Sequence, residues 1–365
     1  MAVKVLHCAD FHMDSPFDAL PEDKAAERRR EQRRLLWQIA NIANEKKADV
    51  VLMSGDLFDS NISYYETQEA LLSALGSISA EIFISPGNHD YFCPKSPYSF
   101  LKFPKNVHIF KSPIITSYEL PQIGCRVYGA GFNAPRCMSL LTDFSAMKDD
   151  MVNLMTIHGE LSGNMYNHIS EEDISSSNLD YLALGHTHTF SGIKTAGKTR
   201  YAYPGCPEGR GFDEMGEKGI IFGEVSKGWA DMEFIPLSGR QYRIFEMDLT
   251  GETDATLAVM QKFSGDEYKN DIVRIVFNGI FSGRLDFKTL GDILSEKFFH
   301  VTFKDRTRLG KDIWDSLNDD TLTGLFLKRM RILYDSAEND EAREKVNAAV
   351  RYGLAALENR EEWRP

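Results

Sequence analysis

Residues 81–90 read EIFISPGNHD, and this stretch decides how the N-terminal part of the chain is interpreted. The apolar run at 81–85 predicts a short buried strand. The polar tetrad Gly87-Asn88-His89-Asp90 follows that strand directly. Typical residue usage makes a chance match to this tetrad about one in a thousand for a chain of this length. A buried strand followed by a rare polar loop indicates an α/β sheet with a site at its carboxyl edge.

Four further polar motifs follow predicted strands in the same way. They are Asp10-x-His12, Gly55-Asp56, His158-Gly159 and Gly185-His186-x-His188. Ligands of α/β folds gather at the carboxyl ends of strands, so all five loops can converge on one site. In an extended segment, side chains two residues apart point the same way, so both members of a His-x-His or Asp-x-His pair can reach a metal. Donors of the Asp, Asn and His types, without cysteine, suit Mn, Fe or Zn better than Ca or a thiolate zinc site.

The spacing of apolar runs predicts three parts of the chain. Residues 1–237 begin with strands at 3–9, 49–54 and 81–85 separated by helices, and continue with more closely spaced strands. That order predicts two packed sheets flanked by helices. Residues 238–310 begin with a linker at 238–240, carry a βαβαβ pattern and are expected to form a small α/β cap. Residues 311–365 form a helical C-terminal segment, with helices alone expected over 312–362.

An apolar seam in the C-terminal segment leaves two readings open. Val346, Val350, Gly353 and Leu357 follow 4-3-4 spacing. This seam either docks a partner coiled coil or packs back onto its own chain. A basic run at residues 28–34 is also ambiguous, since it can track a DNA backbone or form a solvated helix face. Cys206, in a Gly/Pro turn, is expected to be a small buried residue.

Composition excludes some classes of protein and leaves others. Among 365 residues, 42 Lys and Arg face 54 Asp and Glu, which gives a formal net charge of −12. That charge argues against a general basic coat for nucleic acid, but a bound cation can reverse the local field of an acidic site. Five cysteines without a CxxC pair fit a reduced, cytoplasmic chain. Neither a signal peptide nor a membrane span is expected.

The ordered motifs resemble the calcineurin-like metallophosphoesterase superfamily. Within it, the segments HCADFHMDSPF, SGDLFD, SPGNHD, IHGE, LGHTHT and YPGCPEGRGFDE are similar to SbcD-type, YhaO-like bacterial DNA repair exonucleases. The likeness is strong over residues 1–237 and weak over the cap. It implies a four-layer αββα metallophosphoesterase sandwich with a small α/β capping domain and a helical C-terminal tail. GNHD in place of GNHE disfavours the protein phosphatase branch.

The resemblance also implies a role for each motif residue. One divalent ion would be held by Asp10, His12 and His188, and a second by Asn88, His158 and His186, with Asp56 bridging both. His89 would stabilise or protonate the leaving oxygen, and Asp90 would orient the His89 ring and raise its pKa. Arg210 and Tyr91 are candidate substrate contacts. Mn²⁺ is the expected cofactor, with Fe or Zn as alternatives. Two such ions supply an activated water and neutralise charge on the phosphoryl oxygens.

The leading functional prediction is a two-metal-dependent DNA phosphodiesterase. The resemblance implies a 3′-to-5′ exonuclease with single-strand endonuclease activity, which works in DNA repair as a homodimer with an SbcC-type, SMC-like ATPase. One alternative is a phosphodiesterase or phosphomonoesterase acting on small nucleotides, which the acidic charge favours. Another is a metal-bound, non-enzymatic scaffold for an ATPase, against which the intact His89-Asp90 pair argues. The cap and the helical tail favour the nuclease.

Overall fold

The computed structural model describes residues 2–357 apart from residues 238, 282, 284, 309–313, 315–316 and 318–319. The chain divides into two compact units, residues 1–241 and 242–365. The predicted division into three parts stays a prediction, because its boundary at 310/311 lies outside the described residues. Parts of two other predicted segments also lie outside the described residues: residue 238 of the linker and residues 312–313, 315–316, 318–319 and 358–362 of the helical segment.

Two sheets form the centre of the first unit. The first sheet contains β1 (Val3–Cys8), β2 (Val50–Met53), β3 (Glu81–Ile84), β4 (Val107–Ile109), β11 (Gly219–Ser226) and β12 (Trp229–Pro236). Its order is β12-β11-β1-β2-β3-β4, with β1 to β4 parallel and β11 antiparallel to β1. The second sheet contains β5 (Thr116–Leu120), β6 (Cys125–Ala130), β7 (Val152–His158), β8 (Tyr181–Gly185), β9 (Lys194–Ala196) and β10 (Thr199–Ala202). Its order is β5-β6-β7-β8-β10-β9, in which β6, β7, β8 and β10 are parallel.

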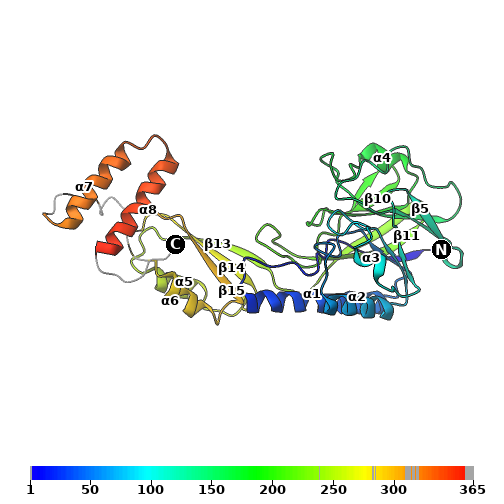
Figure 1. Cartoon of the computed structure of the whole chain (residues 1–365), viewed down its shortest axis with the longest axis horizontal. Helices are drawn as coiled ribbons and strands as arrows, with labels where there is room; N and C mark the ends of the chain where they lie inside the picture. The colour runs from blue at the N-terminus through cyan, green and yellow to red at the C-terminus, as the bar shows by residue number, and fades with distance from the viewer. Residues whose placement is uncertain are drawn as a thin grey trace. The chain divides into compact units, whose positions relative to one another are not determined.

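Helices cover the outer faces of these sheets. They are α1 (Glu22–Glu45), α2 (Tyr65–Ser77), α3 (Pro97–Phe100) and α4 (Glu171–Ser176). The 3-10 turn η1 (Pro121–Ile123) instead packs through Ile123 against the core between the sheets. In Figure 1, α1 and α2 lie together along one side of the unit and α4 lies on the opposite side. The apolar stripe of α1, with Leu36 and Ile39, packs in one core cluster with Leu6 and Val51 of the first sheet. Its residues follow the 3.6-residue helical period.

Side-chain alternation along the strands separates three layers of core. Val5 of β1 points into the space between the sheets, where it packs with Val127 and Leu154 of the second sheet. The neighbouring Leu6 points to α1 instead. On the far side of the second sheet, Met155 packs in a cluster with Ile174 of α4. The order helix, sheet, sheet, helix is the αββα sandwich, so the predicted fold is confirmed.

The second unit contains a smaller parallel sheet, whose strands are connected by two helices, and then a further pair of helices. Its elements are β13 (Tyr242–Asp248), α5 (Ala255–Lys262), β14 (Ile272–Asn278), α6 (Phe287–Leu294), β15 (His300–Asp305), α7 (Leu322–Asp335) and α8 (Asp340–Leu357). The βαβαβ pattern predicted from the sequence is present, with order β13-β14-β15 and parallel pairing. The predicted seam of α8 packs on its own chain, since Val350 lies in a cluster with Leu327 and Met330 of α7.

One prediction about α1 is wrong in part. Arg28, the first residue of the basic run, is fully buried and pairs with Glu208 and Glu31. It belongs neither to a solvated face nor to an exposed DNA track. Arg30 and Arg34 of the same run are exposed. Among the described residues, no helix has both the length and the apolar character needed to cross a bilayer.

Candidate metal centre

The five motif loops meet at the carboxyl edges of the two sheets. Asp10 and His12 follow β1, Asp56 follows β2, and Asn88 follows β3. His158 ends β7, and the His186 loop follows β8. Parallel strands place all these ends on one side of their sheet, and the packing of the two sheets brings the edges together. The convergence predicted from sequence is therefore present.

The backbone of these loops is strained at the proposed ligands. Four of these ligands have a left-handed φ, a backbone conformation that residues other than glycine rarely adopt: Asp10 (56°), His12 (45°), Asp56 (51°) and His186 (112°). Each such residue costs on the order of 1–3 kcal/mol and persists only where the surroundings fix it. In the described part of the chain, four of the ten non-glycine residues with positive φ are proposed ligands, and strained residues of this kind often occur at functional sites.

Two glycines let these loops approach one another closely. A Cβ at Gly87 would lie 2.2 Å from Oδ1 of Asp56. Gly55 has a φ of +93°, and a Cβ there would lie 2.5 Å from Nδ1 of His158. Only hydrogen fits at both positions, so the Gly55-Asp56 and Gly87-Asn88 motifs carry glycine for steric reasons.

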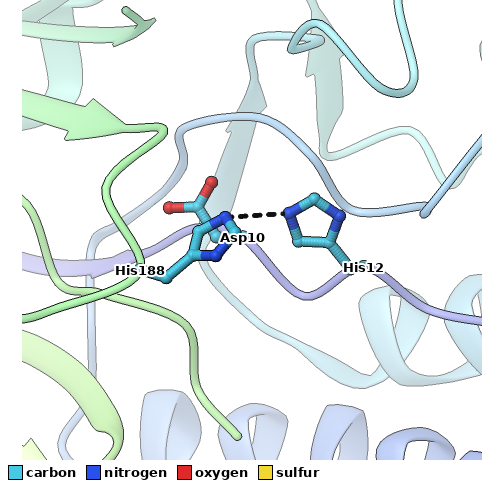
Figure 2. A group of neighbouring side chains, drawn as sticks. All are labelled: Asp10, His12 and His188. Atoms are coloured by element: carbon cyan, nitrogen blue, oxygen red, sulfur yellow. Dashed lines mark hydrogen bonds between the residues drawn. The ribbon is translucent and has the colours of Figure 1, made fainter. Parts of the chain in front are cut away.

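The first group of donors consists of Asp10, His12 and His188. One ligand atom from each lies within 4.8 Å of the other two. Figure 2 shows the three side chains converging. The planes of the two imidazoles are inclined at 73°, and their Nε2 atoms lie 3.2 Å apart. Asp10 is fully buried, and both of its carboxylate oxygens accept the backbone N–H of His186.

The second group of donors consists of Asn88, His158 and His186. Oδ1 of Asn88 lies 2.9 Å from Nε2 of His158 and 3.3 Å from Nδ1 of His186. Nδ1 of His158 lies 2.9 Å from the carbonyl oxygen of Ser54, to which it donates. That hydrogen bond leaves Nε2 of His158 with its lone pair directed into the site.

Asp56 lies between the two groups. Its Oδ2 is 3.7 Å from Nε2 of His12 and 3.4 Å from Nε2 of His158. Its Oδ1 accepts the backbone N–H of His89 at 2.9 Å, which fixes the carboxylate plane. One carboxylate is thus in reach of both donor groups, as the predicted bridging role requires.

The ionisation of these residues suits cation binding. Burial lowers the pKa of His12 to about 4 and that of His186 to about 4, and it also lowers the pKa of His158. These imidazoles are uncharged at neutral pH, which is the form that binds metal. Burial, reinforced by the charge of Asp56, raises the pKa of Asp10. Burial would raise the pKa of Asp56 too, but the imidazoles of His158, His12 and His89 hold it below its ordinary value.

The residues present therefore fit divalent metal ions. Nδ1 of His188 lies 2.7 Å from a carboxylate oxygen of Glu214, so the ring proton is on Nδ1. Nε2 of His188 then faces Nε2 of His12 at 3.2 Å with no proton of its own. A cation shared by nitrogen and carboxylate donors satisfies such a cluster. Bound there, divalent ions supply an activated water and charge neutralisation at a phosphoryl group. The identity of the metal stays a prediction.

His89 lies at the exposed side of the cluster. Its ring makes an edge-to-face contact with His12, with centroids 4.6 Å apart. Nδ1 lies 3.1 Å from the backbone carbonyl of Asp59, to which it donates. This anchor leaves Nε2 as the nitrogen that can exchange a proton with a substrate oxygen. The general-acid role of His89 stays a prediction, with which this exposed, anchored ring is compatible.

The role predicted for Asp90 is wrong. Its carboxylate does not contact the His89 ring. Instead it is fully buried and accepts the backbone N–H groups of Leu57, Phe58 and Gly87 and the hydroxyl of Tyr98. Burial and the charge of Asp56 raise the pKa of Asp90 to about 6. Asp90 ties the Asp56 loop to the Asn88 loop and positions both.

The two predicted substrate contacts differ in their surroundings. Tyr91 is half-buried beside the tetrad, and its role stays a prediction. The Arg210 guanidinium contacts the carboxylates of Asp59 and Glu214. Neither carboxylate was singled out from the sequence, although both lie within motif segments that resemble the family. Cys206 is fully buried as expected, and burial raises the pKa of its thiol.

A cavity opens beside the second donor group. Its volume is about 390 Å³, and its lining includes His186, Glu160, Thr187, Lys194 and Tyr203. Oε2 of Glu160 lies 3.9 Å from Nε2 of His186, and Lys194 is exposed. The volume is in the range of small-ligand sites, and the lining combines an ammonium group, a carboxylate, hydroxyls and an aromatic ring.

The fold and the site together define a metal-dependent phosphoesterase. The family model described as calcineurin-like phosphoesterase matches residues 3–190, more than half of the chain, and the chain belongs to this family.

Two named proteins are similar to this chain. "Uncharacterized metallophosphoesterase YhaO" of Bacillus subtilis (strain 168) is 28% identical over 243 residues, which are 63% of this chain and 59% of that protein. "DNA double-strand break repair protein Mre11" of Saccharolobus solfataricus is 24% identical over 334 residues, which are 84% of this chain and 83% of that protein. The chain thus matches less than two thirds of the length of the first relative.

Proposed function

We propose that this chain is a two-metal-dependent DNA phosphodiesterase, a 3′-to-5′ exonuclease with single-strand endonuclease activity. Asp10, His12 and His188 hold one Mn²⁺, Asn88, His158 and His186 hold the other, and Asp56 bridges them. The observation that carries this proposal is the position of Asp56, with one oxygen 3.7 Å and 3.4 Å from a histidine of each donor group.

His89 supports a diester as the substrate. Hydrolysis of a phosphodiester expels an alkoxide, which is a poor leaving group. An acid that protonates the leaving oxygen contributes about 10²–10⁴ in rate. The ring is exposed, and its Nδ1 is anchored to the carbonyl of Asp59. The cavity beside His186 supports the same substrate, because a diester carries a second substituent that needs space next to the scissile phosphate. The exposed Lys194 can contact a neighbouring phosphate.

One relative supports DNA as the polymer. It is named as a protein of DNA double-strand break repair and matches most of this chain. From the resemblance of the motif segments to SbcD-type exonucleases, we propose that the chain works in DNA repair with an SbcC-type ATPase, and as a homodimer. With a net charge of −12, affinity for DNA is expected to come from the metal ions and local basic residues.

One assay tests the substrate class. Purified full-length protein with Mn²⁺ is offered end-labelled duplex DNA, single-stranded DNA, bis-p-nitrophenyl phosphate and p-nitrophenyl phosphate. We expect cleavage of both DNA substrates, with mononucleotides released from 3′ ends of the duplex. Cleavage of the small esters alone would overturn the nuclease proposal in favour of a small-nucleotide phosphoesterase. No cleavage of any ester, with metal bound, would favour the scaffold.

A second experiment tests the role of His89. His89→Ala is expected to keep both metal ions and to lose about 10²–10⁴ in kcat on DNA. The loss on bis-p-nitrophenyl phosphate should be smaller, because p-nitrophenolate leaves without a proton. His108→Ala is the matched control, since His108 on β4 pairs with Glu81 on β3 and lies outside the motifs. Loss of a metal ion from His89→Ala would make His89 a ligand instead, which its distance to His12 and Asp56 also allows.

A further inference from the structure

Two carboxylates lie against the outer nitrogens of the first pair of imidazoles. Oε1 of Glu214 lies 2.7 Å from Nδ1 of His188. Oδ1 of Asp59 lies 3.2 Å from Nδ1 of His12. The Nε2 atoms of the same two rings face one another at 3.2 Å. Both imidazoles of one donor group therefore have a carboxylate on the Nδ1 side and the ligand nitrogen inside. Glu214 is hydrogen-bonded to His188, whereas Asp59 lies within ion-pair distance of His12 without hydrogen-bond geometry.

Such carboxylates orient a metal-binding histidine. Hydrogen bonding at Nδ1 fixes the tautomer and the ring plane, and it makes Nε2 more basic; removing partners of this kind typically weakens metal affinity 10–100-fold. Glu214 is buried, so its contact with His188 is little weakened by water.

One arginine joins the two carboxylates. Nη1 of Arg210 lies 3.1 Å from Oδ1 of Asp59, and Nη2 lies 2.6 Å from Oε1 of Glu214. Nε and the backbone N–H of Arg210 both donate to Oε2 of Glu214, at 3.3 Å and 2.8 Å. Nη2 also lies 3.2 Å from Nδ1 of His188, but that nitrogen carries the proton donated to Glu214. The guanidinium is thus engaged with protein carboxylates on two sides.

The loop that carries Arg210 is held in place from outside the site. Fully buried Arg28 of α1 donates to the carbonyl of Gly209 at 3.0 Å and pairs with Glu208. Nζ of Lys218 donates to the carbonyl of His188 at 2.9 Å. Arg210 is therefore presented to Asp59 and Glu214 by a fixed backbone.

We propose that Arg210 is a positioning residue that holds Asp59 and Glu214 against His12 and His188, and so sets the affinity of one of the two metal sites. This inference rests on the ligand roles proposed above, but it does not depend on DNA as the substrate. It replaces the prediction that Arg210 contacts substrate. The second site, built from Asn88 and the remaining histidines, does not use Arg210.

Metal titration tests this proposal without measuring turnover. The full chain is stripped of metal with a chelator, and Mn²⁺ alone is titrated by calorimetry, with free Mn²⁺ followed by electron paramagnetic resonance. Arg210→Ala is expected to bind one ion 10–100-fold more weakly and the other within twofold of wild type. Arg210→Lys should recover little, because a single ammonium cannot serve both carboxylates in the planar fork of a guanidinium.

Two further variants test whether Arg210 affects metal affinity through Glu214 and Asp59. Glu214→Gln and Asp59→Asn should each weaken the same site as Arg210→Ala. Combined with Arg210→Ala, each should add less than its own single effect, because the three side chains act as one unit.

The matched control is Arg126→Ala. Arg126 is also a buried arginine between two carboxylates, Glu119 and Asp149. It lies near the start of β6, whereas the metal-binding loops follow the carboxyl ends of the strands. Its loss should lower thermal stability and leave both Mn²⁺ affinities unchanged.

Three results would overturn the proposal. Unchanged Mn²⁺ binding in Arg210→Ala, with a raised KM for a phosphodiester, would make Arg210 a substrate contact. Equal weakening of both sites, or the same loss in Arg126→Ala, would mean that Arg210 acts through general stability. A wild-type chain that binds fewer than two Mn²⁺ would instead overturn the proposed two-metal site itself.

Discussion

Gly87→Ala adds one methyl group where two motif loops touch. The new Cβ would lie 2.2 Å from Oδ1 of Asp56, 2.8 Å from Cγ of Asp56 and 2.8 Å from its backbone nitrogen. Contacts below 3.0 Å are essentially never found for a real Cβ. The carboxylate oxygen must therefore move by at least about 0.8 Å, since the methyl group itself is fixed by the backbone. Gly87 does not have a left-handed φ, so the effect is steric and not conformational.

The displacement has a calculable consequence. Asp56 would lose its hydrogen bond from the backbone of His89, now 2.9 Å long, and Oδ2 would leave its place between His12 and His158. A misplacement of about 1 Å in a catalytic group can cost 10²-fold in rate. Overpacking of a buried site costs about 1–3 kcal/mol of stability. We expect about a 100-fold loss in kcat, weaker binding of both metal ions, and a modestly lowered Tm.

The measurement combines Mn²⁺ titration, phosphodiester kinetics and thermal unfolding on the same preparation. Gly76→Ala in α2 is the matched control, because its Cβ would lie 3.5 Å from Cγ of Pro104, an ordinary contact. That control should be neutral or stabilise by about 0.5–1 kcal/mol, since alanine is favoured within a helix. If Gly87→Ala keeps both ions and kcat within a few-fold of wild type, Asp56 does not bridge the two groups.

Other perturbations follow from buried polar groups. For the metal-free protein, the pKa values of His12 and His186, near 4, lie below the unfolded value of 6.5, so each histidine should remove up to about 1.4 kcal/mol of stability per unit as pH drops below 6.5. The raised pKa of Asp90, about 6, offsets part of that loss below pH 6; flat urea midpoints between pH 7 and 6 would contradict this. Gln32→Ala should cost about 1–3 kcal/mol in urea unfolding, because Gln32 donates to two carbonyls of the first motif loop. Arg28→Ala should cost about 3–5 kcal/mol by leaving Glu208 buried and unpaired, and adding Glu208→Gln should recover part of that loss; the idea fails if the double variant is less stable than the single one.

Helical spacing can predict that Arg28 is buried but cannot predict its partner. Charge alone placed the basic run of α1 at the surface, and Arg30 and Arg34 are indeed exposed. The buried positions of α1 include residues 25, 28, 32, 35, 36, 39 and 43. That spacing contains Arg28, so the 3.6-residue period was the signal that could have found it. The partner Glu208, 180 residues away, has no signature in the sequence.

Asp90 shows why neighbours in sequence need not be partners in space. It follows His89 directly, and a carboxylate next to an imidazole suggested a pair. In the loop the two side chains diverge, so that His89 meets the carbonyl of Asp59 while Asp90 meets backbone N–H groups of Leu57, Phe58 and Gly87. A buried carboxylate needs donors, and the two adjoining loops supply them.

The sequence by itself predicted two packed sheets flanked by helices and the five polar loops that meet at their edges. Short apolar runs that alternate with helical segments predict parallel strands. Parallel strands bring their carboxyl ends, and the polar residues that follow them, to one edge of the sheet. Only the tertiary structure decided which groups support the donor residues of these loops. Asp59, Arg210 and Glu214 lie in irregular loops, where no periodicity fixes side-chain direction, and Arg210 and Asp59 are 151 residues apart. Their contacts exist because the packed sheets hold those loops against one another, and that packing depends on the whole core and not on any local pattern.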